Sequence, residues 1–228
     1  MDTVRAKRQR RSTPKVRTRR PPDLPDDLAP AADPARLFQG REITVSHAVI
    51  TDVDLGALSA TNLRIDTAVL ERVALPTSVI AAIRLRDVRL VGCDLANIET
   101  RALTAVRVEF VNCHMTGFRT TEACDAEDVL FTEGTLRYSQ FVASRFHFCE
   151  FVSCNMSDAA FEGADLRGSV FRQCALRNVD LTGAKLDGTD LRSSELENLR
   201  LNPKDVYGVV VDPAQAMVLS ALLGIRIR

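Results

Sequence analysis

Residues 161–191 read FEGAD LRGSV FRQCA LRNVD LTGAK LDGTD L, and a large apolar residue opens every group of five. This stride continues without a break from Phe131 to Leu201. An earlier run follows it from Val45 to Met115, one residue out of phase with the later run. A five-residue period matches neither the helical period of about 3.6 residues nor the two-residue alternation of a strand. The stretch therefore predicts an internal structural repeat.

A small or apolar residue also stands two positions before each of these large residues. Side chains two residues apart on a strand point to the same side, so both positions face inward and the residue between them faces out. Three residues then form one short strand, and the other two turn a corner. Glycine tolerates positive φ and suits the second corner position. It takes that position at Gly92, Gly117, Gly163, Gly168, Gly183 and Gly188.

Four such sides would close a coil of about twenty residues, and the whole repeat would form about seven and a half coils in a rod about 36 Å long. The stride places Phe131, Phe151 and Phe171 above one another on one inner face. Similar side chains in successive coils would then fill the centre of the rod.

Three units, at residues 164–168, 179–183 and 189–193, resemble the A-D/N-L-x-x unit of the pentapeptide repeat family. The resemblance extends over residues 43–201 and implies an all-β fold, the right-handed quadrilateral β-helix. In the first run, bulky residues occupy inward positions where the family prefers small ones, so we expect wider or irregular coils there. These residues are Leu58, Leu63, Ile83, Ile98 and Leu103.

The repeat sets the predicted domain organisation. We expect a disordered, basic, proline-rich tail over residues 1–36 and an N-terminal cap over 37–42. The β-helix follows over 43–201, with its phase slip at about 119–128. Residues 202–228 are predicted to form a C-terminal cap and dimerisation helix.

The tail is strongly basic. Residues 1–30 contain nine Lys or Arg and four Asp, a net charge of +5, and have too few large apolar side chains to fold alone. Either the tail is a solvated arm, or it makes an electrostatic contact with nucleic acid or with an acidic surface, including the protein's own rod. The candidate contact residues are Lys7, Arg8, Arg10, Arg11, Arg19 and Arg20.

Acidic residues concentrate in the C-terminal half of the rod, where residues 121–201 hold fourteen acids and eight bases. Four acids cluster at the phase slip, which is either a simple β-bulge or a projecting acidic loop that contacts a partner. The candidate partner-binding residues are Glu122, Asp125, Glu127, Asp128, Glu133, Asp158, Asp165 and Asp180. Glu162, Asp187 and Asp190 face outward in the same half.

A helix is predicted near the C-terminus, because Asp212 suits its N-cap, Pro213 its first position and Gly224 its end. A lid over the last coil needs one apolar face, and this helix has more apolar residues than that. The surplus favours an isologous dimer contact. The candidate dimer residues are Met217, Val218, Leu219, Leu222 and Leu223.

Neither catalysis nor a cofactor or metal is predicted, because His47, His114 and His147 are scattered without partner nucleophiles or carboxylate pairs. The six cysteines lack zinc-site spacing and are expected to be reduced and mostly packed inside the coil. No apolar stretch is long enough for a membrane span and no secretory leader is recognisable, so the expected location is the cytoplasm.

The fold is sufficient for a non-catalytic scaffold that contacts a protein partner, and this is the first functional hypothesis. The alternative comes from the C-terminal arrangement, whose Asp212–Ala216 segment resembles quinolone-resistance and mycobacterial fluoroquinolone-resistance members of the family. That resemblance implies a homodimer that binds DNA gyrase or topoisomerase IV by imitating duplex DNA. Contact of the basic tail with nucleic acid is a further option, and no membrane contact is expected.

Charge gives a first test of this alternative. Duplex DNA carries about one negative charge per 1.7 Å, or roughly 21 over the length of the rod, whereas residues 31–228 carry a net charge of −5. Dimerisation at the C-terminal helices would bring two halves of −6 together, giving −12 over about 38 Å of central rod. The charge of the whole rod is therefore too small for uniform mimicry of duplex DNA, and mimicry is expected only at an acidic dimer centre.

Overall fold

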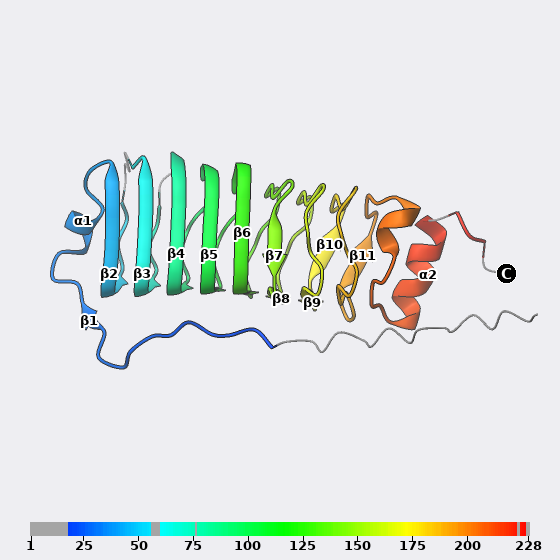
Figure 1. Ribbon diagram of the computed structural model, residues 1–228, viewed down its shortest axis with the longest axis horizontal. Coiled ribbons are helices and arrows are strands. Elements are labelled where there is room, and N and C mark those ends of the chain that lie inside the picture. Colours follow the sequence, from blue (N-terminus) through cyan, green and yellow to red (C-terminus); the bar gives the residue numbers. More distant parts are fainter. Residues whose placement is uncertain (1–17, 56–59, 76, 223, 227–228) are drawn as a thin grey trace, which may run out of the picture.

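The computed structural model describes residues 18–55, 60–75, 77–222 and 224–226. Figure 1 shows parallel strands stacked in one row along the long axis, with a helix closing the C-terminal end. The first strands are long: β2 Glu42–Thr51, β3 Asn62–Glu71, β4 Val79–Val91, β5 Glu99–Val111 and β6 Arg119–Thr132. The later strands are short: β7 Arg145–His147, β8 Glu150–Val152, β9 Val170–Arg172, β10 Ala175–Arg177 and β11 Glu195–Glu197.

The strand register advances by twenty residues per coil. Val45 pairs with Ile65 and Ile65 with Leu85, while Phe151 pairs with Phe171 beyond β6. Isolated bridges such as Asn155 to Ala175 keep the same step between the short strands. The predicted β-solenoid is confirmed.

The aromatic stack of the core is also as predicted. Parallel ring pairs have centroid distances of 4.8 Å for Phe131 with Phe151 and 4.6 Å for Phe151 with Phe171. The stack extends one coil further, because Phe110 lies 4.8 Å from Phe131. Offset-stacked rings add favourable contact beyond the apolar area that they bury.

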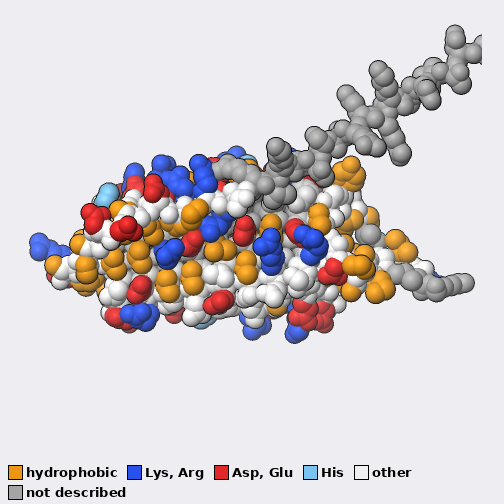
Figure 2. Space-filling view, turned by 90° about the horizontal axis from the view of Figure 1, so that it is seen from below, with side chains coloured by type: hydrophobic (Ala, Val, Ile, Leu, Met, Phe, Trp, Pro, Cys, Tyr) orange, Lys and Arg blue, Asp and Glu red, His pale blue; other side chains and the backbone are white. Residues whose placement is uncertain are grey.

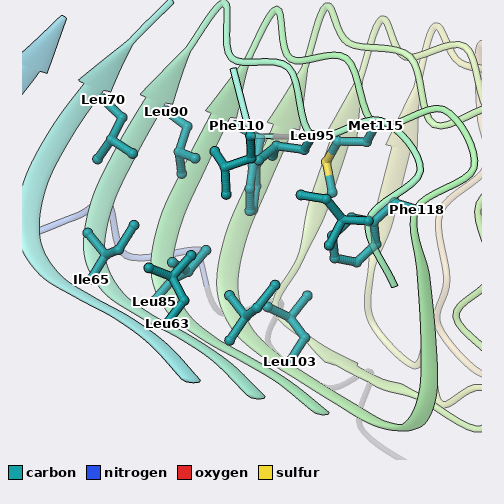
Figure 3. Close-up of a pocket in the computed structure, with 13 residues that line it drawn as sticks. Leu63, Ile65, Leu70, Leu85, Leu90, Leu95, Leu103, Phe110, Met115 and Phe118 are labelled. Atoms are coloured by element: carbon teal, nitrogen blue, oxygen red, sulfur yellow. The ribbon is translucent and has the colours of Figure 1, made fainter. Parts of the chain in front are cut away.

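The two halves of the solenoid differ as the bulky inward residues suggest. Long strands β2 to β6 run through a corner, whereas later sides are three-residue strands or single bridges. β-branched and large aliphatic residues favour extended backbone, which explains the longer strands. Leu63, Ile83, Ile98 and Leu103 point into the interior around a dry cavity of about 30 Å³ (Figure 3). Leu58 lies outside the described residues.

Corners impose positive φ on many residue types. The six predicted corner glycines all have φ between 60° and 75°. Nineteen non-glycine residues in the described chain also have positive φ, among them Asp87, Arg107 and Asp128. Positive φ costs conformational free energy in residues other than glycine. The surrounding ladder of hydrogen bonds holds these residues in that conformation.

The N-terminal segment differs from the predicted disordered tail. Residues 1–17 lie outside the described residues, but residues 18–36 have a defined course. Strand β1, Ala29–Pro30, pairs with Ala48 and Val49 of β2. Helix α1, Pro34–Leu37, follows, and the Asp33 side chain accepts a hydrogen bond from the Arg36 amide. These elements cover the otherwise open edge of the first coil, and pairing supplies the order that the sequence composition does not.

The C-terminal end has the predicted helix. A 3₁₀ turn, Pro203–Val206, precedes helix α2, Pro213–Leu222. The Asp212 carboxylate accepts a hydrogen bond from the Gln215 amide, as an N-cap does, and Gly224 has a φ of 76° beyond the last turn. Neither α1 nor α2 has the length and apolar content of a membrane-crossing helix, and the described part of the chain has no other α-helix.

All six cysteines are buried and unbonded. Five of the thiols donate to backbone carbonyls, as Cys149 Sγ does to the Ala126 oxygen at 3.5 Å. Burial raises the pKa of the Cys124 thiol to about 12 and also raises that of Cys149.

Replacing a stacked ring should leave a hole that the fixed coils cannot close. We expect Phe151→Ala to lower the free energy of unfolding by about 3–5 kcal/mol, measured by urea denaturation. The exposed Val142→Ala change is the control, with an expected effect within about 0.5 kcal/mol. Equal effects of the two changes would contradict a packed interior.

The cysteines should be unreactive in the folded protein. At pH 8 the Cys124 and Cys149 thiols remain protonated because their pKa values lie well above the pH, and the coil shields all six. Ellman's reagent should therefore react with six thiols in guanidinium chloride and with almost none in buffer. Rapid reaction of the native protein would show that the coils open readily.

Candidate interaction surfaces

Ion pairs between coils cover much of the outer surface. Parallel register places side chains twenty residues apart next to each other, so opposite charges can pair across coils. Arg72 Nε lies 2.6 Å from Asp52 Oδ1, and Arg145 Nη2 lies 2.5 Å from Asp125 Oδ2. Exposed pairs of this kind contribute little to stability because solvent screens them. Their larger effect here is to neutralise the surface locally.

The phase slip is a β-bulge inside β6. The pairing of β5 with β6 shifts by one residue between Thr100–Thr120 and Ala102–Ala123, and both sides of the shift remain in the strand. Inward residues fix the register before and after this point, so one extra residue is absorbed locally. The structure places a bulge here, in a continuous strand, and not a projecting loop.

The predicted acidic residues near the bulge do not form one free patch. Glu122 pairs with Arg101 and Asp125 with Arg145. Arg20 contacts both Glu127 and Asp128. Among the five, only Glu133 is exposed without an ion pair to another described residue. The candidates are thus arranged as follows: Glu122 and Asp125 on the exposed outer face, Glu127 half-buried, Asp128 buried and Glu133 at an exposed corner.

The predicted acids of the later coils are also paired. Arg137 lies 3.6 Å from Asp158, and Arg200 lies 3.6 Å from Asp180. Asp165 is 8% exposed and accepts from Arg167 at 2.6 Å. The hydrogen bonds from Arg167 lower the pKa of Asp165 below its ordinary value, although burial acts in the opposite direction.

Ion pairs therefore neutralise most of the acidic residues in this half of the solenoid. Within residues 121–201, seven of the eight basic residues form ion pairs. The described acids of this half without an ion pair are Glu133, Glu150, Glu162 and Asp187. Glu150 lies in the middle of one side of the coil, Glu133 and Asp187 lie at the two corners that bound that side, and Glu162 lies at another corner. Figure 2 likewise shows acidic and basic side chains interspersed on the face in view.

Two predicted basic residues of the tail contact the protein's own solenoid. Arg19 Nη2 lies 2.9 Å from Glu109 Oε1, and Arg20 Nε lies 2.7 Å from Asp128 Oδ2. The other tail candidates, Lys7, Arg8, Arg10 and Arg11, lie outside the described residues. Of the contacts considered from the sequence, the one with the protein's own rod is therefore present.

Two further acids take part in this contact, Asp87 and Glu109, and neither was predicted from the sequence. Asp87 accepts from Arg107 Nη2 at 2.5 Å and from the Asp23 amide at 2.9 Å. Burial alone would raise the pKa of Asp87, but these hydrogen bonds outweigh it and the pKa lies below its ordinary value. Asp87, Arg107 and Asp128 occupy the same corner in three successive coils, when one residue is added for the bulge. This alignment in the sequence was the signal that could have predicted the cluster.

Helix α2 closes the last coil. Gln215 is buried, and its Nε2 donates to the carbonyl oxygens of Leu191 at 2.6 Å and Ser194 at 2.7 Å. Leu219, one turn later, is 7% exposed and packs in the core. Leu219 therefore lies on the side of α2 that faces the last coil. The prediction that it takes part in a dimer contact was wrong.

The outer side of the same helix is apolar and open. Met217 is 57% exposed and Val218 is 39% exposed. Tyr207 and Val210, in the segment that leads to the helix, are also exposed. Met217 and Val218 thus keep their place as candidate dimer residues. The side chains of Leu222 and Leu223 lie outside the described residues.

In the part of the chain that the structure describes, chemically reactive groups do not converge. All three histidines are exposed, and His114 Nδ1 lies 3.5 Å from Asp94 Oδ1. Within the described residues, no three His, Cys, Asp or Glu side chains form a group that could hold a metal ion. A hollow of about 90 Å³ beside β3 to β5 is lined by three arginines, one aspartate, one threonine and three aliphatic residues: Arg64, Arg84, Arg86, Asp66, Thr104, Ile65, Leu85 and Val106.

Comparison with known proteins supports the repeat assignment. A family model of the pentapeptide repeat region matches residues 124–201. Among solved structures, a trypsin-treated form of QnrB1, a plasmid-mediated fluoroquinolone resistance protein, is 18% identical with a TM-score of 0.45, covering 88% of this chain and 96% of that chain. The pentapeptide repeat protein Rfr23 from the cyanobacterium Cyanothece 51142 is 16% identical with a TM-score of 0.37, covering 54% of this chain and 91% of that chain.

HetL from Nostoc sp. strain PCC 7120, a pentapeptide repeat protein involved in heterocyst differentiation regulation, is 14% identical with a TM-score of 0.31, covering 76% of this chain and 86% of that chain. No curated protein matches this chain. Residues 124–201 are therefore a pentapeptide repeat region, and coils of the same length continue from it back to β2.

Proposed function

We propose that this chain is a non-catalytic interaction protein whose β-solenoid presents fixed outer side chains to a protein partner. One observation carries this proposal. The interior is filled by apolar side chains, whereas the outer surface consists of side chains that the coil holds in register. Stacked repeats offer extended surfaces of this kind for binding. Catalysis usually needs polar groups that converge in a concave pocket, and the interior cavity is lined by apolar side chains.

Recovery of the partner tests this proposal. The tagged full chain should retain a second protein in stoichiometric amount from the cells that produce it, and the tagged partner should retain this chain. Hydrogen exchange of the purified complex should then show slower exchange in outward-facing strand segments. A complex without protection on the solenoid surface, or turnover of a small-molecule substrate by the purified chain, would contradict the proposal.

A homodimer is proposed as the assembly, joined through the open apolar side of α2. Large apolar side chains such as Met217 are 57% exposed there, which is costly in water unless a partner covers them. In an isologous dimer the same patch serves both subunits, so a single substitution acts twice.

Charge at the centre of this patch should separate the subunits. We expect Met217→Glu to weaken the dimer by about 100-fold or more, because two carboxylates would meet in an apolar contact. Sedimentation velocity should show a monomer with an unchanged circular dichroism spectrum. Val142→Glu, at an exposed apolar position on the coil, is the matched control and should remain dimeric. A wild-type monomer at micromolar concentration would exclude the dimer.

The second candidate function is binding to a type II topoisomerase as a duplex-DNA mimic. The excess of acids in residues 121–201 favours it, because the proposed dimer would bring two such halves together. The ion pairs described above weigh against a continuous acidic face. The carboxylates outside ion pairs would then make the main electrostatic contribution.

A supercoiling assay with purified DNA gyrase tests the mimic. If it is correct, wild-type protein should inhibit supercoiling at micromolar concentration, and higher salt should weaken the inhibition steeply. Replacing Glu133, Glu150 and Glu162 by Gln and Asp187 by Asn should reduce inhibition by about tenfold or more. Neutralising four acids of the N-terminal half, Glu42, Asp52, Asp54 and Glu71, is the control. No inhibition, or equal loss in both variants, would leave only the first function.

A further inference from the structure

Residues 18–30, called the arm from here on, run as an extended segment along one edge of the solenoid (Figure 1). At one end, β1 pairs with β2. Further along, the Asp23 amide donates to Asp87 in β4, and at the other end Arg20 reaches Asp128 in β6. The arm therefore crosses five successive coils.

Three carboxylates lie beneath the arm, and all are buried. Asp87 is 6% exposed, Glu109 is 7% exposed and Asp128 is fully buried. Each accepts from the arm: Asp87 from the Asp23 amide at 2.9 Å, Glu109 from Arg19 at 2.9 Å, and Asp128 from both the Arg20 amide at 3.1 Å and its Nε at 2.7 Å. We call these three carboxylates and their surroundings the arm groove.

The groove also contains two arginines of the solenoid. Arg107 donates to Asp87 at 2.5 Å and 2.6 Å, and Arg89 donates to Glu109 at 2.9 Å. With Glu127, which Arg20 approaches at 3.4 Å, four carboxylates meet four guanidinium groups when the arm is in place. Two of those four guanidinium groups come from the arm. The arm thus supplies guanidinium groups to Glu109, Glu127 and Asp128, while its Asp23 carboxylate also acts on Arg107 and Arg86 acts on Asp87.

The sequence of the arm fits this surface in a specific way. Its two amides that donate to groove carboxylates belong to Arg20 and Asp23, and the residues between them are Pro21 and Pro22. Proline has no amide hydrogen, so no donor is left without a partner between the two contacts. Proline also favours extended backbone before binding, which reduces the entropy lost when the segment is ordered.

The contacts from the arm to the three carboxylates are all polar. No residue of 18–30 is fully buried, although the Arg19 side chain is only 13% exposed against 53% for that of Arg20. A peripheral segment without fully buried residues opens at lower free-energy cost than the core. When the arm leaves, another peptide segment with similar charged groups can bind in the arm groove.

We propose that the arm groove is a peptide-binding site for an extended segment with two adjacent arginines followed by prolines. The chain's own arm fills it in this structure, and a protein partner carrying such a segment binds by displacing the arm. This inference rests on the proposed interaction function and names the chemistry of one partner. The arm is then a built-in competitor, because a tethered segment has an effective concentration of about millimolar.

Direct binding of the arm sequence in trans tests the proposal. The probe is a fluorescein-labelled synthetic peptide of residues 18–28, followed by fluorescence anisotropy. The protein is the full chain, either wild type or with Arg19→Gln and Arg20→Gln to release the arm. We expect the arm-released chain to bind the peptide at least about tenfold more tightly than the wild type, because its competitor is weakened.

Two controls locate the binding. In the arm-released chain, adding Asp128→Asn or Glu109→Gln should weaken binding by about tenfold or more, while Asp165→Asn, at an ion-paired acid away from the groove, should not. A peptide with both arginines replaced by glutamine should not bind. Equal affinity of the wild-type and arm-released chains, or binding that Asp128→Asn and Glu109→Gln leave unchanged, would overturn the proposal.

Hydrogen exchange provides a readout that does not require the groove variants to fold. In the wild-type chain the Arg20 and Asp23 amides should exchange slowly, and they should exchange at near-random-coil rates in the arm-released chain. Adding excess unlabelled peptide to the wild type should speed their exchange as the arm leaves. Fast exchange of both amides in the wild type would show that the groove is not occupied. Failure here would leave the proposed function standing, since that is tested by partner recovery.

Discussion

The parallel register of twenty residues is the constraint on which the rest of the structure depends. It places each inward side chain above its counterpart in the next coil, so that Phe110, Phe131, Phe151 and Phe171 form one stack. The paired backbone therefore fixes the position of each ring relative to the rings above and below it. The same constraint explains why corners accept residues such as Asp87 and Phe148 with positive φ, because the paired strands before and after each corner hold it in place.

The outer surface follows from the same register. A charge on one coil always has a neighbour twenty residues away, and the sequence repeatedly places an opposite charge there. This converts an acidic half into a surface of local ion pairs with four carboxylates outside them. Net charge counted along the sequence is therefore a poor guide to the field that a partner meets. The distribution favours recognition by specific side-chain columns over recognition by a uniform negative charge.

The two ends of the solenoid are protected in different ways, and both have consequences for binding. At the C-terminal end, Gln215 and Leu219 hold α2 on the last coil, while Met217 and Val218 remain open. At the N-terminal end, β1 and α1 cover the first coil, and the chain before them lies along the groove formed by Asp87, Glu109 and Asp128. The N-terminal cap is therefore also the tether of the arm. A partner that removes the arm need not disturb the core.

The five-residue period alone determined the solenoid, its inward residues and the aromatic stack, because burial repeats with the coil and is visible in the order of apolar residues. The helix caps at Asp212 and Gly224 were equally local and were predicted correctly. Tertiary structure decided the course of residues 18–36, the side of α2 that faces the core, and the pairing of the acids. Asp128 looks like any acid of the slip in the sequence. In the folded chain it is fully buried and accepts from Arg20, 108 residues earlier. A contact across that separation leaves no periodic pattern in the sequence.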